Sequence, residues 1–194
     1  MDNDALLDLF IANGHVYPNV DQTGTSTYRQ RNQLLRNVGR GQYRPITKEV
    51  GGPLLVEHSS RGAAFGDVDN DGDIDVLISN LDDRPILLRN DSNGGHWITI
   101  RLEGVRSNRS AIGAKVVVRT GTRRQTAEVR SGGSYLSHND TRAHFGLAAT
   151  TTVDQVIIRW PNGVMENVGP LSADRFYLVR EGEGVQQESR QARR

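Results

Sequence analysis

Three observations predict an all-β chain built in two parts. Short apolar segments that end at Gly, Asn or Pro recur along the 194 residues, as strands joined by tight turns do. No long stretch has the period of about 3.6 residues that marks an amphipathic helix. An aspartate pattern occurs twice at a fixed offset, which is typical of repeated structural units. We therefore expect repeat units over residues 1–94 and a small β-sandwich-like unit over 95–182.

The strands expected in the first part are short apolar runs that stop at turn residues. Residues 32–37 and 86–90 share the string Leu-Leu-Arg-Asn, so each is expected to be the same strand of two successive repeats. The polar residues 21–27 predict a loop. Three further segments are expected to be extended or to connect strands, and these are 6–12, 42–50 and 53–58.

The second part begins after Gly95 with an alternating strand, 97–102. Residues 114–119 and 125–130 flank Thr120-Gly121-Thr122 and predict a hairpin. A strand over 153–160 ends at Pro161-Asn162-Gly163, and 176–180 is expected to be the last strand. We expect Trp97 and Trp160 to be packing residues of this part. From Glu181 on the chain is polar, and residues 183–194 predict a disordered tail.

The second aspartate pattern has a carboxylate at every other position, and it runs through Asp67, Asp69, Asp71, Asp73 and Asp75. Carboxylates this close repel one another unless a cation neutralises them. Ca²⁺ suits them because it takes about six to eight oxygen ligands. Gly72 stands where the loop needs a sharp turn. The pattern predicts a calcium site with side-chain ligands from Asp67, Asp69, Asp71 and Asp75 and the carbonyl of Asp73; the alternative is a solvated acidic turn.

The first copy of the pattern is incomplete. Asp2, Asp4 and Asp8 lie 67 residues before Asp69, Asp71 and Asp75, and Ala5 replaces the turn glycine. The first carboxylate of the pattern would precede Met1. Because affinity falls with ligand number and charge, we expect this second calcium site to be weak or empty. We also expect that Met1 is not the natural start of the folded unit.

Several motifs resemble known families. Phe65-Gly66-Asp67 with the aspartate series and Val76-Leu77-Ile78 resembles an FG-GAP (VCBS-type) repeat, the calcium-bearing blade of integrin-like β-propellers. Residues 96–180 resemble the ASPIC/UnbV domain, which follows such repeats in cartilage-acidic-protein-like proteins. The matching strings include Ser107-Asn108-Arg109-Ser110-Ala111-Ile112-Gly113-Ala114, Gly132-Gly133-Ser134-Tyr135-Leu136-Ser137, His144-Phe145-Gly146-Leu147 and Arg159-Trp160-Pro161-Asn162-Gly163. The resemblance implies incomplete propeller blades whose upstream partners are missing, followed by a β-sandwich-like domain.

The net charge of +1 hides an asymmetry along the chain. Residues 65–91 hold eight acidic and two basic side chains, a net of −6, and residues 101–130 hold eight basic and two acidic ones, a net of +6. The basic stretch predicts either solvent-facing residues of short strands or a polyanion patch at Arg106, Arg109, Arg123 and Arg124. Nucleic acid is disfavoured because 101–130 contains no aromatic residue for base stacking.

The function that we expect is a non-enzymatic, calcium-stabilised binding or adhesion module of an exported protein, extracellular, at the cell surface or periplasmic. Its ligand would be a protein or a carbohydrate. There is no cysteine, no signal peptide and no run of about 20 apolar residues that would span a membrane. Two alternatives stay open: the polyanion-binding protein, and a hydrolase of polysaccharide or ester that uses Ser137, His138 and Asp140, with His144 nearby. We expect no catalytic residues.

Overall fold

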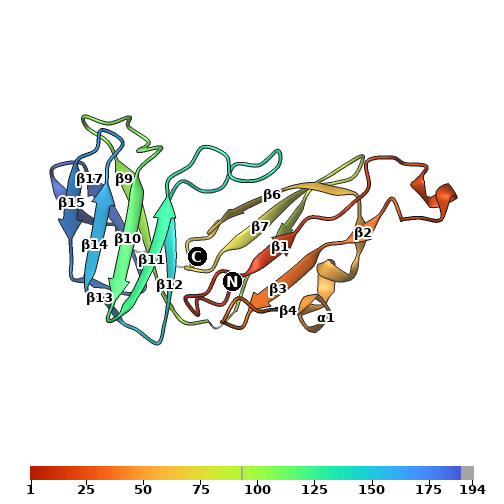
Figure 1. Ribbon diagram of the computed structural model, residues 1–194, viewed down its shortest axis with the longest axis horizontal. Coiled ribbons are helices and arrows are strands. Elements are labelled where there is room, and N and C mark those ends of the chain that lie inside the picture. Colours follow the sequence, from red (N-terminus) through yellow and green to blue (C-terminus); the bar gives the residue numbers. More distant parts are fainter. Residues whose placement is uncertain (93, 189–194) are drawn as a thin grey trace.

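The structure is a computed structural model that describes residues 1–92 and 94–188, and it confirms an all-β chain (Figure 1). The first part combines short strands with a few single helical turns. Its sheets have the strand orders β1-β3-β4, β2-β5 and β6-β7-β8. The elements are β1 (Leu9–Ile11), η1 (Val20–Thr23), β2 (Gln30–Arg31), β3 (Gln33–Asn37), β4 (Tyr43–Pro45), α1 (Thr47–Val50), η2 (Gly52–Leu55), β5 (Glu57–His58), β6 (Ser60–Gly66), β7 (Asp75–Asn80) and β8 (Ile86–Leu88).

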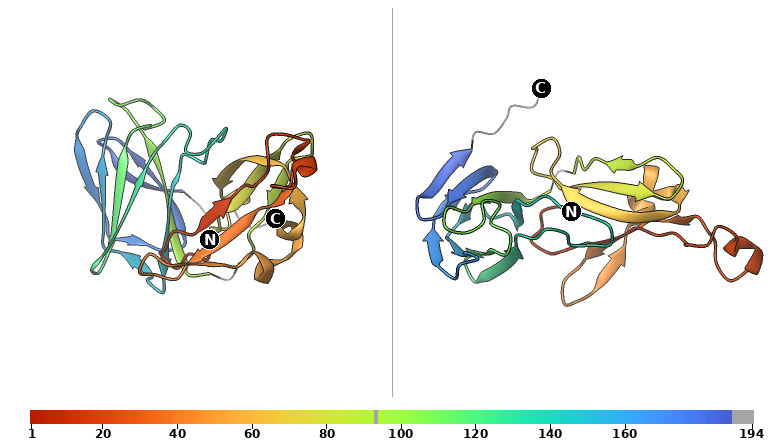
Figure 2. Two further views of the ribbon diagram at one scale, coloured as in Figure 1. Left: turned by 45° about the vertical axis from the view of Figure 1, so that its right-hand side comes forward. Right: turned by 90° about the horizontal axis from the view of Figure 1, so that it is seen from above.

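The second part is a sandwich of two four-stranded sheets, β11-β10-β14-β15 and β12-β9-β17-β18, with the short pair β13-β16. The two parts lie side by side (Figure 2). The strands are β9 (His96–Glu103), β10 (Lys115–Thr120), β11 (Arg123–Glu128), β12 (Ala143–Ala148), β13 (Thr152–Val153), β14 (Gln155–Arg159), β15 (Met165–Val168), β16 (Leu171–Ser172), β17 (Arg175–Arg180) and β18 (Gly184–Glu188).

In the structure, the internal repeat predicted from the aspartates appears as the same set of hydrogen bonds in both copies. Asp75 Oδ1 accepts the backbone N–H of Asn90 at 2.8 Å, and Asp8 Oδ1 accepts that of Asn37 at 2.8 Å. The amide of each asparagine donates to the carbonyl oxygen just before the aspartate, at 3.3 and 3.1 Å. The strands β7 and β1 therefore take the same place in two successive units, and β8 and β3 do likewise.

Ala5 occupies a backbone conformation that favours glycine. Its φ is 68°, and Gly72, its counterpart in the second unit, has a φ of 93°. A left-handed conformation costs a residue with a β-carbon about 1–2 kcal/mol. We expect Ala5→Gly to raise the free energy of unfolding by about 1 kcal/mol in denaturant titrations. Ala64→Gly, within β6, is the control and should lower it by roughly 0.5–1 kcal/mol. An equal loss in both variants would contradict this interpretation.

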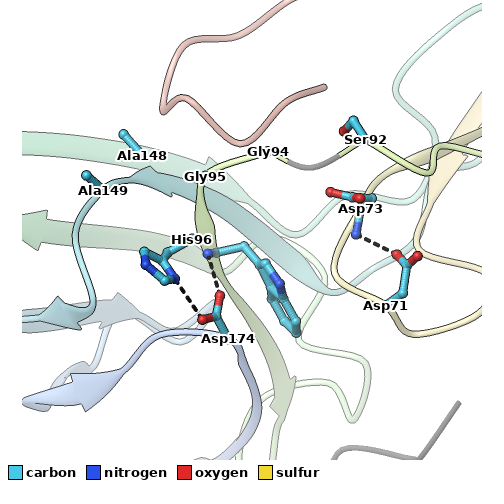
Figure 3. Close-up of a pocket in the computed structure, with 10 residues that line it drawn as sticks. Asp71, Asp73, Ser92, Gly94, Gly95, His96, Ala148, Ala149 and Asp174 are labelled. Atoms are coloured by element: carbon cyan, nitrogen blue, oxygen red, sulfur yellow. Dashed lines mark hydrogen bonds and ion pairs between the residues drawn. The ribbon is translucent and has the colours of Figure 1, made fainter.

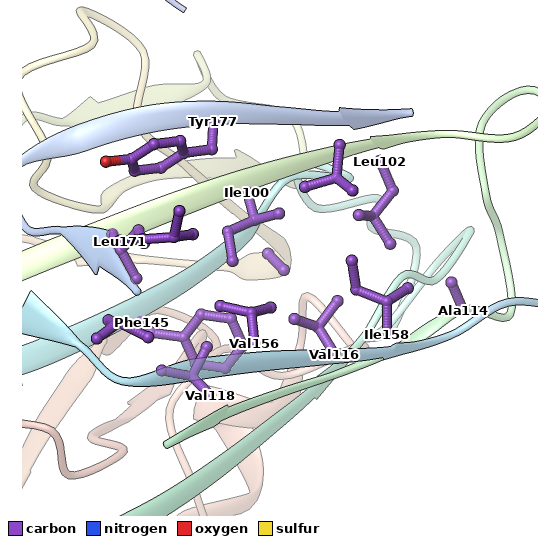
Figure 4. Packing of buried hydrophobic residues seen from close by; sticks show 14 of the residues in the cluster. Ile100, Leu102, Ala114, Val116, Val118, Phe145, Val156, Ile158, Leu171 and Tyr177 are labelled. Atoms are coloured by element: carbon purple, nitrogen blue, oxygen red, sulfur yellow. The ribbon is translucent and has the colours of Figure 1, made fainter. Parts of the chain in front are cut away.

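The sandwich encloses the main hydrophobic core (Figure 4). Val116 and Val118 of β10 and Val156 and Ile158 of β14 are each at most 1% exposed, and they point from one sheet into the core. Alternate residues of a strand point to opposite faces, so their neighbours lie on the outer face of that sheet. From the other sheet the core receives Ile98, Ile100, Leu102, Phe145, Tyr177 and Val179.

Strand β9 is buried on both faces over most of its length, which the sequence alternation did not predict. Ile98 and Ile100 point into the core, while Trp97 and Thr99 point the other way and are only 4% and 2% exposed. These two side chains face the junction with the repeat part. Their burial makes β9 the strand on which the two parts meet.

The prediction of a disordered tail from residue 183 is wrong for the residues that the structure describes. Arg180 pairs with Gly184 across a tight turn, and β18 continues antiparallel to β17 as far as Glu188. The turn has positive φ at Gly182 and Gly184, 75° and 82°. A polar edge strand with one apolar contact, Val185, resembles a solvated tail in sequence. Residues 189–194 lie outside the described part.

Other segments also differ from expectation, and the strand β6 is among those that were not predicted. The segment 42–50 is a strand only at Tyr43–Pro45 and then forms a single α-helical turn. The strands β12 and β15 were not predicted. Small residues interrupt β12, whose buried positions alternate with half-buried ones, so its apolar pattern is weak. Within 1–92 and 94–188, every helix is a single turn, and none is long and apolar enough to cross a bilayer.

Candidate metal site

The aspartate loop connects β6 to β7 and folds back on itself. One carboxylate oxygen each from Asp67, Asp69 and Asp71 lies within 4.8 Å of the others. Two oxygens on opposite sides of one calcium ion would be about 4.6–5.2 Å apart. The three carboxylates are therefore close enough to share an ion. Among the described residues, no other group of three or more His, Cys, Asp or Glu side chains converges in this way.

Backbone N–H groups hold Asp67 in place. Its two carboxylate oxygens accept the N–H of Asp71 at 3.0 Å and that of Gly72 at 2.8 Å. The side chain is only 4% exposed. Burial raises the pKa of the Asp67 carboxyl, while the N–H groups of Gly72 and Asp71 and the charge of Arg142 act to lower it. Burial thus makes the ionised form of Asp67 costly, and a bound cation would offset that cost.

Asp73 and Asp75 do not belong to the convergent group. The oxygens of Asp75 accept the N–H of Val68 at 2.9 Å and of Asn90 at 2.8 Å, so this side chain ties the loop to the strand that follows β7. Asp73 Oδ1 accepts the amide of Asn3 at 3.0 Å. Each carboxylate oxygen of Asp75 has a second lone pair beyond its hydrogen bond, and the carbonyl of Asp73 is a further oxygen donor. Their role as ligands remains a prediction.

The carboxylates of the first copy are engaged separately. Asp2 Oδ2 lies 3.1 Å from Arg36 Nη2. Asp4 Oδ1 accepts the N–H of Leu6 at 2.8 Å. Asp8 contacts the amino group of Met1 and accepts the N–H of Asn37. These three side chains do not form one of the convergent groups of the described residues.

A direct contact joins the aspartate loop to β9. A β-carbon placed on Gly72 would lie 1.8 Å from Cε2 of Trp97, so the indole lies flush against the glycine backbone. Trp97 also packs on Phe176, with ring centroids 4.8 Å apart. Two features require glycine at position 72: its φ of 93° and the close approach of the Trp97 indole to its backbone.

Asn3 connects both loops to the second part. Its amide nitrogen donates to the carbonyl of Gly72 at 3.1 Å and to Asp73 at 3.0 Å, and its oxygen contacts Nε2 of His144 at 2.8 Å. His144 Nδ1 meets the hydroxyl of Thr99 at 2.9 Å. Burial lowers the pKa of His144 to about 4, helped by the amino terminus and Arg142. The imidazole is therefore neutral at pH 7 and donates from Nε2 to Asn3.

Arg142, from the second part, contacts the start of the loop. Its guanidinium donates to the carbonyl of Asp67 at 2.8 Å and to Asn70 Oδ1 at 2.6 Å. It also bonds Asp140 at 2.6 Å and lies 5.3 Å from the ring centre of Phe176. The second part thus supplies a cation that braces the outside of the aspartate loop.

A cavity of about 530 Å³ opens between the loop and β9 (Figure 3). Asp71 and Asp73 line one side, and His96 and Asp174 line the other. His96 Nδ1 lies 2.7 Å from Asp174 Oδ2. The cavity is polar and reaches the side chains of Asp71 and Asp73, which are only 7% and 8% exposed, so it offers a route by which an ion can reach the loop.

The polar loop that raised a hydrolase alternative has other partners. The Ser137 hydroxyl donates to the carbonyl of Tyr135 at 2.8 Å, and His138 Nδ1 lies 2.7 Å from the carbonyl of Asn139. Asp140 is paired with Arg142. Hydroxyl, imidazole and carboxylate therefore do not form a chain of hydrogen bonds. The loop instead extends the edge of β6: the backbone N–H of Asp140 donates to the carbonyl of Phe65 at 2.9 Å, and the N–H of Phe65 donates to Asn139 Oδ1 at 3.1 Å.

The four arginines considered for a polyanion patch do not lie together. Arg106 and Arg109 are in the loop before β10, at the end of the hairpin where Lys115 pairs with Glu128. Arg123 and Arg124 are at its other end, beside Thr120. Arg123 Nη1 donates to the carbonyl of Asp4 at 3.2 Å. All four side chains are exposed, but they form two separate groups.

Sequence reasoning missed the residues that connect the parts. Asn3 carried a signal, because it is the counterpart of Asn70 in the repeat, and both have positive φ, 56° and 58°. The sequence contains no signal for Arg142 or for the role of His144, because each acts through a contact between segments that are distant in sequence. Glu181, assigned to the start of the tail, is a buried anchor, 7% exposed.

Comparisons with known proteins agree with this architecture. The FG-GAP-like repeat family matches residues 1–78, and the family described as ASPIC and UnbV matches residues 104–186. Cartilage acidic protein 1 of Homo sapiens is 29% identical over 171 residues, which cover 84% of this chain and 24% of the relative. The Mus musculus protein of that name is also 29% identical, covering 84% of this chain and 25% of the relative. The chain spans about a quarter of the length of the curated relatives it matches.

Proposed function

We propose that this chain, whose residues 1–78 match the FG-GAP-like repeat family and whose residues 104–186 match the family described as ASPIC and UnbV, is a non-enzymatic binding module whose repeat part is stabilised by calcium. The observation that carries the proposal is the convergence of Asp67, Asp69 and Asp71 within 4.8 Å. Two of these carboxylates are buried and gain little from solvent. A divalent cation would turn their mutual repulsion into attraction.

The donor set favours calcium over other ions. All of the donors at the loop are oxygens, with no Cys or His in the convergent group, so zinc and other soft-ligand metals fit poorly. In the proposal, Asp67, Asp69 and Asp71 supply side-chain oxygens and Asp73 its carbonyl. Asp75 secures the loop through its two hydrogen bonds and offers a remaining lone pair. The Asp2, Asp4 and Asp8 loop stays weak or empty.

Calcium would act on the fold rather than on a reaction. The loop touches the second part through Trp97, Asn3 and Arg142, so an ion that fixes the loop also fixes the junction. A ligand that binds only the folded state stabilises it by about 2.7 kcal/mol at a hundredfold excess over its dissociation constant. The binding role itself, to a protein or carbohydrate outside the cell or in the periplasm, rests on the family likeness.

Isothermal titration calorimetry with CaCl₂ tests the metal assignment. The wild-type chain should bind one calcium ion at this loop, and Asp71→Asn should weaken binding at least about tenfold because it removes one charged ligand. Asp82→Asn is the matched control. Asp82 is an exposed aspartate in the same acidic segment with a φ of 52°, which asparagine tolerates. Equal affinities of the two variants would refute the site.

A further inference from the structure

The outer face of the sheet β11-β10-β14-β15 carries a group of cations, which we term the basic face: Lys115, Arg119, Arg124 and Arg159. Figure 1 shows these four strands side by side. Val116 and Val118 point into the core, so Lys115 and Arg119 point outward. The register places Arg124 beside Arg119 and Arg159 beside Lys115, on the same outer face. All four side chains are exposed.

The cations of the basic face are paired like with like. Arg119 lies directly opposite Arg124, and Lys115 lies directly opposite Arg159. Like charges at directly opposed positions destabilise a sheet. Glu128 is also opposite Lys115, but its carboxylate bonds Arg130 at 2.9 Å. Among the described residues, none of the four cations forms a side-chain hydrogen bond or ion pair. The arrangement opposes folding and is without internal compensation.

The spacing of the basic face suits a chain of anions. Opposed residues are about 5 Å apart across the strands. Lys115 and Arg119 are four positions apart on one strand, which is about 13 Å. Between these rows lie Val117 and Ile157, both half-buried, and the exposed Thr126. The basic face is therefore a flat surface whose cations are about 5 Å apart across the strands and about 13 Å apart along them, with a short apolar strip between the rows.

The composition of the face separates the classes of polyanion. It has no aromatic side chain, so it lacks the stacking platform that single-stranded nucleic acids use. It also lacks the aromatic anchors that dominate protein interfaces. Acidic polysaccharides need neither, because sulfate and carboxylate groups project from successive sugars and meet cations one by one.

We propose that the basic face binds a linear acidic polysaccharide, with contacts from Lys115, Arg119, Arg124 and Arg159. This surface goes beyond the calcium-stabilised binding role, because it lies in the second part and uses no residue of the aspartate loop. It also differs from the patch expected from the sequence, of which Arg124 alone lies on this face. The unpaired cations are retained for a ligand and lower the stability of the free chain.

Calorimetry with a size-defined heparin fragment tests the surface. The quadruple variant K115Q/R119Q/R124Q/R159Q should lose affinity by at least about tenfold at 50 mM NaCl, and R124Q alone by roughly twofold to fivefold. Wild-type affinity should fall steeply between 50 and 200 mM NaCl, as expected when cations neutralise a polyanion. Uncharged dextran should not bind. The melting temperature of R124Q should equal or exceed that of the wild type, because one like-charge pair is gone.

A charge-matched variant separates the basic face from net charge. R101Q/R106Q/R109Q/R175Q removes the same four charges from exposed positions away from the face. It should keep its heparin affinity within about threefold of wild type, the small change being a long-range charge effect. An equal loss in both quadruple variants would overturn the proposal. Tighter binding of single-stranded DNA than of heparin at equal salt would overturn the polysaccharide assignment. Heparin affinity should survive EDTA, so failure of the calcium proposal would leave this one standing.

Discussion

Replacing Gly72 with alanine will destabilise the chain by about 3–5 kcal/mol, because a β-carbon there overlaps the Trp97 indole and adopts an unfavourable backbone conformation. The new carbon would lie 1.8 Å from Cε2 and 2.0 Å from Nε1. The indole has little room to retreat, since Phe176 packs on it at 4.8 Å and His144 stacks at 6.1 Å. Guanidinium titrations followed by tryptophan fluorescence will measure the loss.

The variant Gly39→Ala separates the cost of the left-handed backbone conformation from the cost of the overlap with Trp97. Gly39 has a similar φ of 85°, and a β-carbon there would meet nothing within 4 Å. This control should lose only about 1–2 kcal/mol, the cost of the left-handed conformation. The double variant Gly72→Ala/Trp97→Ala should lose less than the sum of its single variants, because the overlap disappears. Equal losses in Gly72→Ala and Gly39→Ala would show that the indole does not constrain the loop.

Replacing Glu181 with glutamine will cost about 3 kcal/mol, because several donors converge on this buried carboxylate. One oxygen accepts the backbone N–H of Val105, Arg106 and Ser107, each at 2.8 Å. The other accepts the Ser107 hydroxyl at 3.1 Å and the amide of Asn162 at 2.6 Å. Glutamine would remove the charge and point an N–H₂ group at some of these donors. Denaturant titrations should show the loss.

The effect of this anchor depends on pH. Burial alone would raise the pKa of Glu181, but the N–H groups of Ser107, Val105 and Arg106 and the amide of Asn162 outweigh it and lower the pKa to about 2. The unfolded chain binds the proton from about pH 4.5 downward, so the stabilisation is present above pH 4.5 and disappears toward pH 2. The gap in stability between wild type and Glu181→Gln should close over that window.

Two comparisons separate the effect of the Glu181 charge from other effects of charge and pH on stability. Glu183→Gln, two residues further on, breaks only an exposed pair with Arg180 and should cost at most about 0.5 kcal/mol. His144, with a folded pKa of about 4, destabilises every variant between about pH 6.5 and 4, because the unfolded imidazole takes up a proton first. Taking the difference in the free energy of unfolding between wild type and Glu181→Gln at each pH removes this shared loss. A pH-independent gap would mean that the charge of Glu181 contributes nothing.

The sequence predicted what depends on local pattern. The aspartates at alternate positions predicted a loop whose carboxylates converge, as those of Asp67, Asp69 and Asp71 do, and the 67-residue offset predicted the repeat that the bonds of Asp8 and Asp75 reproduce. The β-branched run of β10 and the turn at Gly121 gave the hairpin. Each is a short-range signal, in which neighbouring residues decide the conformation.

The rest depends on contacts between distant segments, which leave no mark in one sequence. Glu181 looks like the first residue of a polar tail, and only the loop around Arg106 explains its burial. Arg123 and Arg124 are neighbours in sequence but point to opposite faces of an edge strand. The stretch 101–130, with its net charge of +6, therefore does not form a single surface of that charge, because successive residues of a strand point to opposite faces of the sheet.

The contact of Asn3 with both Gly72 and His144 has a consequence for how the chain folds as it leaves the ribosome. The partners of this one side chain are 69 and 141 positions away. At about 5–20 residues per second, the first loop must wait about 7 to 28 seconds after its synthesis before His144 has been made. Strand β17, central in its sheet, emerges later still. The repeat part therefore completes its packing only after the second part has been translated. Until then its aspartate loop is without Trp97, Asn3 has one partner fewer, and a nascent-chain chaperone has access to this region.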